Sequence, residues 1–68
     1  MDNCIRELRS KRALTQQHLS ELVNVSSRTI ISLEKGQYNP SVLLAHKLAV
    51  IFECKIEDVF TFSEEDML

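Results

Sequence analysis

Side chains that donate hydrogen bonds, carry charge or offer an aliphatic surface lie at helical spacing near the middle of the sequence. They are Ser27, Arg28, Ile31, Ser32 and Lys35, and a helix over this segment places all of them on one face. An arginine can donate two parallel bonds to guanine O6 and N7, a serine can donate or accept one, and an isoleucine can touch a thymine methyl. The spacing therefore indicates a helix that reads base pairs in the major groove of DNA.

Each of these residues also has a plainer interpretation. Arg28 is then a solvated arginine on an exposed helix, Ser27 and Ser32 bond only to their own backbone, and Ile31 packs against the following loop. We favour DNA contact for Arg28 and packing for Ile31, and we leave both interpretations open for the two serines.

Two cysteines and two histidines form a set that could hold zinc. However, Cys4, His18, His46 and Cys54 lack the close paired spacing of zinc sites, and no two of them share a helical face four residues apart. We therefore predict no metal site, and we expect both cysteines to be reduced packing residues.

The 68 residues contain no evident arrangement for catalysis. Carboxylates gather in the tail from Glu64 to Asp66, and no serine, histidine and aspartate can be placed together in a cleft. The chain is therefore predicted not to be an enzyme, and no cofactor or small-molecule ligand is predicted.

Helical segments must position the predicted reading face, and the expected fold class is all-α. Apolar residues at helical spacing predict helices over about 3–13, 16–23, 27–35 and 42–52, and a last turn or two over 56–60. The inner face of the second helix is assigned to Leu19, Leu22 and Val23. The whole chain, 1–68, is read as one domain, in which Thr61 to Ser63 could form a short strand or an interface arm.

Local signals fix the ends of the middle helices. Thr15 is expected to cap the second helix, with Leu14 and Leu19 packing across the cap, and the same arrangement recurs around Ser26. Between these helices Asn24 tolerates the left-handed backbone that a tight turn requires. Two short helices joined in this way form a helix-turn-helix, whose first helix holds the second at the protein surface.

The formal charge of −2 is divided unevenly along the chain. Residues 1–40 carry six basic and four acidic side chains, whereas residues 41–68 carry two basic and six acidic ones. A polyanion is therefore steered toward the first half. With 44% hydrophobic residues, one glycine and one proline, the composition excludes disordered and collagen-like chains.

Four motifs follow one another in a fixed order. They are Leu14-Thr15-Gln16-Gln17-His18-Leu19-Ser20, Val25-Ser26-Ser27-Arg28-Thr29-Ile30, Leu33-Glu34-Lys35-Gly36 and Asn39-Pro40. Over about residues 5–60 this set resembles the Cro/C1-type helix-turn-helix family, also called the Xre family, and its small stand-alone repressors in particular. The resemblance implies a compact five-helix, lambda-repressor-like domain that binds operator DNA as a homodimer.

The resemblance also implies roles for individual residues. Base contacts fall on Ser27, Arg28 and Ser32. Contacts with the DNA backbone fall on Gln16, Lys35, Tyr38 and Asn39, although Tyr38 could instead cover the core. A structural ion pair joins Arg9 and Glu34, and it makes physical sense because an acid near the negative end of its helix needs a cation.

The chain departs from the family pattern at three positions. Asn24 stands where glycine is usual, Ser20 where alanine is usual, and Lys55 where a serine or threonine cap is usual. None of these forbids the fold, but the poor cap at Lys55 makes the last helix the weakest element.

A single reading helix offers too few contacts to select one site in a genome, so we predict a homodimer on a palindromic site. The candidate interface residues are Phe52, Ile56, Phe60 and Phe62, of which Phe52 and Phe60 could instead serve only the monomer core. The predicted function is a dimeric transcriptional repressor. The alternative is an antitoxin or another protein-binding module with the same helical fold.

The sequence has neither an apolar run long enough to span a membrane nor the pattern of a signal peptide. We therefore expect a cytoplasmic protein without a membrane partner.

Overall fold

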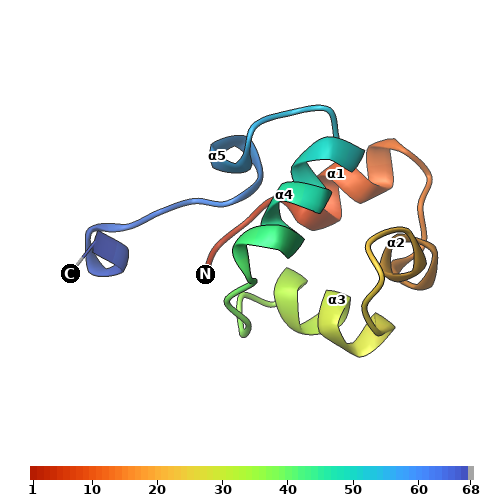
Figure 1. The fold of residues 1–68 in the computed structure, drawn as a ribbon, viewed down its shortest axis with the longest axis horizontal. Coiled ribbons are helices and arrows are strands. Elements are labelled where there is room, and N and C mark those ends of the chain that lie inside the picture. The colour runs from red at the N-terminus through yellow and green to blue at the C-terminus, as the bar shows by residue number, and fades with distance from the viewer. Residues whose placement is uncertain (68) are drawn as a thin grey trace.

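Five α-helices and a final 3-10 turn follow one another in the computed structural model, which describes residues 1–67 (Figure 1). The elements are α1 (Ile5–Lys11), α2 (Gln16–Leu22), α3 (Ser27–Glu34), α4 (Val42–Ile51), α5 (Ile56–Val59) and η1 (Glu64–Met67). Helix α3 packs against α2 and α1, and α4 packs against α5. The all-α architecture with five helices is confirmed.

Three helices begin at hydroxyl caps. The Oγ1 atom of Thr15 accepts the backbone N–H of His18 at 2.9 Å, and the Oγ atom of Ser26 accepts that of Thr29 at 3.2 Å. Ser41 caps α4 in the same way. The predicted starts of these helices are correct because a side-chain oxygen satisfies a backbone donor that has no partner within the helix.

Four helices end on the same backbone motif, in which the residue after the C-cap has a left-handed conformation. These residues are Ala13 (φ 54°), Asn24 (φ 59°), Gly36 (φ 74°) and Glu53 (φ 54°). After α3, for example, the N–H of Gly36 donates to Leu33 O and that of Gln37 donates to Ser32 O. The paired bonds are those of a Schellman motif, which satisfies the last carbonyls of a helix.

Replacing Ala13 with glycine is expected to raise the free energy of unfolding by about 0.5–1 kcal/mol. A left-handed alanine costs about 1–2 kcal/mol, and the greater freedom of glycine in the unfolded chain offsets only part of that gain. Urea unfolding followed by circular dichroism measures the change. The control is Ala49→Gly within α4, which should lower stability; equal changes in the two variants would contradict the interpretation.

The core collects one or more apolar side chains from each α-helix. The largest fully buried ones are Ile5, Leu19, Val23, Ile30, Leu33, Leu48, Val59 and Phe60. Burying each contributes about 1.5–3 kcal/mol, so the core holds the two short helices of the helix-turn-helix against α1 and α4. Ser20, which stands in place of the usual alanine, is also buried, and its hydroxyl donates to Gln17 O at 2.6 Å.

The first four residues connect the end of α3 to α5. The side-chain amide of Asn3 donates to Leu33 O at 2.7 Å, and its backbone forms an isolated antiparallel bridge with Phe60. The N–H of Thr61 donates to Asp2 O at 2.8 Å. This segment therefore anchors both the end of α3 and the start of the tail.

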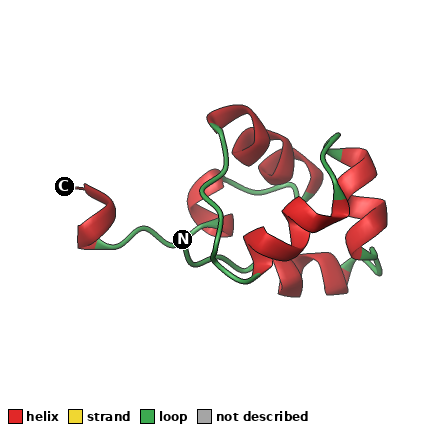
Figure 2. Ribbon diagram, turned by 90° about the horizontal axis from the view of Figure 1, so that it is seen from below, coloured by secondary structure: helices red, strands yellow, loops and turns green. Residues whose placement is uncertain are grey.

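The structure corrects several expectations. Helix α1 is shorter than predicted because the left-handed residue Ala13 follows it. Leu22 was assigned to the inner face of α2, but its side chain is 47% exposed. Residues 61–63 form no strand, and after Thr61 the tail leaves the body in both views (Figures 1 and 2). The poor cap at Lys55 is offset because Asp58 Oδ2 accepts the Lys55 N–H at 3.1 Å.

Candidate nucleic-acid interface

Helix α3 presents one polar face to the outside. Ser27, Arg28, Ile31 and Lys35 are exposed along it, whereas Ile30 and Leu33 point into the core. In the described part of the chain, the side chains of Ser27, Arg28 and Lys35 have no hydrogen-bonding or ion-pair partner within the protein. Their hydrogen-bonding groups are thus available to a ligand.

The other predicted contact residues lie around this face. Ser32 is half-buried at its edge, and Tyr38 and Asn39 are exposed in the loop after α3. Ile31 is exposed, so the favoured packing of this residue against the following loop does not bury it. Tyr38 is also exposed, so if it covers the core it does so with only part of its side chain.

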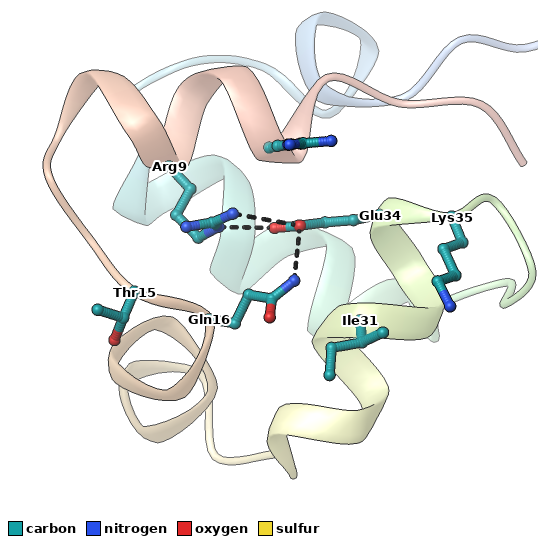
Figure 3. Close-up of a pocket in the computed structure, with 7 residues that line it drawn as sticks. Arg9, Thr15, Gln16, Ile31, Glu34 and Lys35 are labelled. Atoms are coloured by element: carbon teal, nitrogen blue, oxygen red, sulfur yellow. Dashed lines mark hydrogen bonds and ion pairs between the residues drawn. The ribbon is translucent and has the colours of Figure 1, made fainter.

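A hydrogen-bonded network holds α3 to α1 and α2 (Figure 3). Arg9 Nε lies 2.7 Å from Glu34 Oε2, and the side chains are only 15% and 6% exposed. Arg9 also donates to Leu14 O at 2.8 Å, and Gln16 Nε2 donates to Glu34 Oε1 at 3.1 Å. One carboxylate at the end of α3 therefore receives donors from the two preceding helices, which fixes the position of the exposed face.

An open cleft of about 470 Å³ lies between these three helices, beside the network. It is lined by Arg6, Arg9, Thr15, Gln16, Ile31, Glu34 and Lys35. Arg6 was not among the predicted contact residues, although the basic residues of the first helix, Arg6, Arg9 and Lys11, were the signal that could have identified it. Arg6 and Lys35 approach the cleft from different helices, so the structure brings two exposed cations to the rim of one concave surface.

The positive charges around the exposed face of α3 and the cleft are not neutralised by ion pairs. Within residues 1–66, the side-chain ion pairs are Arg9 with Glu34 and the exposed pair Arg12 with Glu53, 3.7 Å apart. The cations of Arg6, Arg28 and Lys35 therefore have no carboxylate partner in the described structure. Such a group of cations attracts a polyanion at low ionic strength and less strongly as salt is added.

The predicted dimer residues separate into two groups. Phe52 and Phe60 are buried in the core of the monomer, which favours the alternative that they serve only that core, because a buried side chain has little surface to offer a partner. Ile56 is half-buried, and Phe62 is 49% exposed at the start of the tail.

The cysteines show packing contacts. Cys4 Sγ donates to Asp58 O at 3.0 Å, and Cys54 packs against the core. Burial raises the pKa of the Cys54 thiol above its usual value, and the negative charge of Asp58 adds to the effect. The thiol therefore stays protonated at neutral pH, which is the unreactive form.

In the described part of the chain, no three histidine, cysteine or acidic side chains come together as metal ligands would. None of the helices there has the length and apolar character needed to cross a membrane.

The fold and this surface define a class of protein: a helix-turn-helix domain with an exposed second helix. A helix-turn-helix family model matches residues 5–59, and the chain belongs to this family, of the Cro/C1 (Xre) type. It is accordingly a transcriptional regulator with a DNA-binding domain, which is not a class of enzyme.

Relatives and a solved structure agree with this assignment. The chain is 51% identical over 63 residues to an HTH-type transcriptional regulator of Archaeoglobus fulgidus, a match that covers 93% of this chain and 89% of that protein. It is 44% identical to the HTH-type transcriptional regulator YgzD of Bacillus subtilis, over 97% of this chain and 100% of that protein. The crystal structure of the restriction-modification controller protein C.AhdI from Aeromonas hydrophila superimposes with a TM-score of 0.74 at 30% identity, over 82% of this chain and 85% of that one.

Proposed function

We propose that the protein is a homodimeric repressor that reads a palindromic operator with α3 in the major groove. The observation that carries the proposal is the exposed face of α3, whose polar groups have no partners in the described chain and whose position is fixed by Arg9, Gln16 and Glu34. A side chain that reads bases must be both free to bond and held in register.

Base recognition is assigned to Ser27, Arg28 and Ser32. Arg28 stands at the exposed N-terminal end of α3, where side chains of a recognition helix reach base edges, and its guanidinium can grip a guanine. Ser27 precedes it and is exposed, whereas the half-buried Ser32 reaches only a base near the edge of the face. Ile31 lies between them and supplies an apolar contact for a thymine methyl.

Contacts with the phosphate backbone are assigned to the rim of this face. Gln16 donates one amide hydrogen to Glu34, and its second amide hydrogen remains for a phosphate. Arg6 and Lys35 add positive charge across the cleft, and Tyr38 and Asn39 lie exposed in the adjacent loop. These groups position the protein on the duplex without reading its sequence.

Dimerisation and repression follow from the size of the domain. Each well-placed base contact gives about 1–3 kcal/mol of discrimination, so a genome-wide search requires two half-sites, about 34–36 Å apart on a straight duplex. A domain of this kind acts on transcription most simply by covering a promoter and blocking polymerase.

Selection of bound sequences from a random duplex pool tests the proposal. At near-physiological salt, a palindromic sequence should be enriched, and that duplex should be bound by two copies of the chain. If no duplex competes better than random sequence, the proposal is wrong.

Replacing Lys35 with alanine is expected to weaken binding to all duplexes by a similar factor. Since a phosphate contact releases a counterion, the slope of log affinity against log salt should fall by about 1 for each copy bound. Fluorescence anisotropy with specific and random duplexes over a salt series measures this. Lys55→Ala, which removes an exposed lysine from the start of α5, is the control and should leave the slope unchanged.

A further inference from the structure

One side of α4 is apolar although it faces outward. Its outer face consists of Val42, Leu43, His46, Lys47 and Val50, which recur at helical spacing. Val42 is 83% exposed, Leu43 62% and Val50 60%, while the opposite side of the helix fills the core. Exposed apolar side chains that gather on one face, with polar residues among them, mark an interaction surface, and this face is such a surface.

Shallow apolar surfaces extend this face at both ends. Near Val42 a pocket of about 160 Å³ is lined by Met1, Pro40, Ser41, Val42, Ala45, Ile56, Phe60 and Phe62. Near Val50 a second pocket of about 310 Å³ is lined by Leu22, His46, Lys47, Val50 and Ile51. The exposure of Leu22, which the sequence did not predict, thus belongs to the same continuous surface.

The tail carries the complementary groups. Phe62 is half-exposed, and the acidic residues Glu64, Glu65 and Asp66 follow it. Asp66 Oδ2 accepts the N–H and the Oγ–H of Ser63, at 2.7 and 3.1 Å, which leaves Glu64 and Glu65 as acids without such internal bonds. The arm is defined as residues 62–66. It starts at the pocket that Phe62 lines and then extends away from the rest of the chain in both ribbon views (Figures 1 and 2).

We infer that the outer face of α4 is covered by the arm of a second copy of this chain, with Phe62 on the apolar side chains and Glu64 and Glu65 beside Lys47. The inference rests on the proposed homodimer and names the surface that forms it. Charge complementarity selects this occupant, because the cation on the outer face is Lys47 and the arm is acidic.

A two-fold axis makes the contact reciprocal. In such a dimer each copy gives its arm and receives the other, so every contact occurs twice and the assembly closes at two copies. The arm starts beside Val42, since Phe62 and Val42 line the same pocket, and its acidic end is free to cross to the other copy. The arms then cover the apolar face that each monomer leaves open.

Two variants of the arm test the inference by sedimentation equilibrium without DNA. Phe62→Ala should weaken self-association at least about tenfold, because an aromatic anchor is lost at two sites. Glu64→Lys with Glu65→Lys should weaken it about 3- to 10-fold through repulsion by Lys47. The matched control reverses two exposed acids elsewhere, Glu7→Lys with Glu57→Lys, and should leave self-association close to that of the unchanged chain.

Mixing two variants distinguishes a second copy from the chain's own arm. Lys47→Glu and the Glu64→Lys, Glu65→Lys chain should each associate weakly alone, whereas a mixture should form heterodimers with nearly the original affinity. In the heterodimer each arm again meets a side chain of opposite charge at position 47 of the other chain. Native mass spectrometry of the mixture reads this directly, and thermal unfolding of each chain verifies that it is folded.

Several outcomes would overturn the inference. They are unchanged self-association of the Phe62→Ala chain, a mixture no tighter than its components, and a chain that remains monomeric at all concentrations. Failure of the proposed function is seen separately, as the absence of an enriched duplex with the unchanged chain. Enrichment of a duplex together with a dimer that does not respond to the arm variants would leave DNA recognition intact and disprove only the role of the arm.

Discussion

Replacing Glu34 with alanine is expected to lower the free energy of unfolding by about 3–5 kcal/mol, as for other ion pairs that lose one partner in a buried setting. Arg9 is 15% exposed and would keep its charge without a carboxylate, and Gln16 would lose its acceptor. Because a chain of 68 residues has a total stability of order 3–10 kcal/mol, much of the variant should be unfolded at moderate temperature. Urea unfolding followed by circular dichroism measures the loss.

Two further variants separate the charge from the packing. Glu34→Gln keeps an acceptor for Gln16 and should lose less stability than Glu34→Ala. Arg9→Met combined with Glu34→Leu removes both charges and should be more stable than Glu34→Ala, because no unpaired charge remains. If the loss of stability in the double variant equals the sum of the losses in the Arg9→Met and Glu34→Leu single variants, the two residues do not act as a pair.

Replacing Arg28 with alanine is expected to weaken binding to the selected duplex by about 10- to 100-fold for each half-site. The guanidinium has no partner within the described chain, so its removal should cost about 1–3 kcal/mol of base recognition and little stability. Competition assays with the selected duplex and with single-base variants measure both effects. The preference for one base over the others should be lost at one position of each half-site and kept at the other positions.

Arg12→Ala provides the matched control for this prediction. It also removes an exposed arginine, but one that lies after α1 and pairs with Glu53 at 3.7 Å. It should leave base discrimination unchanged. Equal losses in the two variants would show that Arg28 contributes only general charge and would contradict its role as a base contact.

The helix starts could be predicted because their causes are local. A hydroxyl oxygen at Thr15, Ser26 or Ser41 accepts a backbone N–H from three residues later, and the sequence shows both the accepting side chain and its distance along the chain from that N–H. The turn at Asn24 was predictable for the same reason, since asparagine is one of the few residues that adopt a left-handed backbone readily.

Other features depend on contacts that sequence spacing does not reveal. Ala13 and Glu53 adopt the left-handed conformation although neither residue type favours it, because the Schellman bonds and the following element impose it. The role of Asn3 was likewise hidden, because its partner Leu33 lies 30 positions away. Leu22 fits the helical period of α2, yet the neighbouring helices leave it exposed.

The candidate site shows the same division. The outward residues of α3 follow from helical periodicity once its inner residues are known, so Ser27, Arg28 and Lys35 were placed correctly on the exposed side. The contribution of Arg6 needed the tertiary arrangement, because only the packing of α1 beside α2 and α3 brings it to the cleft. Phe52 could be assigned to the core or to an interface from the sequence, and only its burial decides.

The side chains on the exposed face of α3 take no part in holding the molecule together. Those of Ser27, Arg28 and Lys35 make no hydrogen bond or ion pair within the described chain, and the network at Glu34 holds the helix from its inner side. Mutations on this face can therefore accumulate without the threat of unfolding that accompanies changes in the core. Descendants of one ancestor can acquire new target sequences on an unaltered scaffold, and an engineer can retarget the protein by randomising those few positions alone.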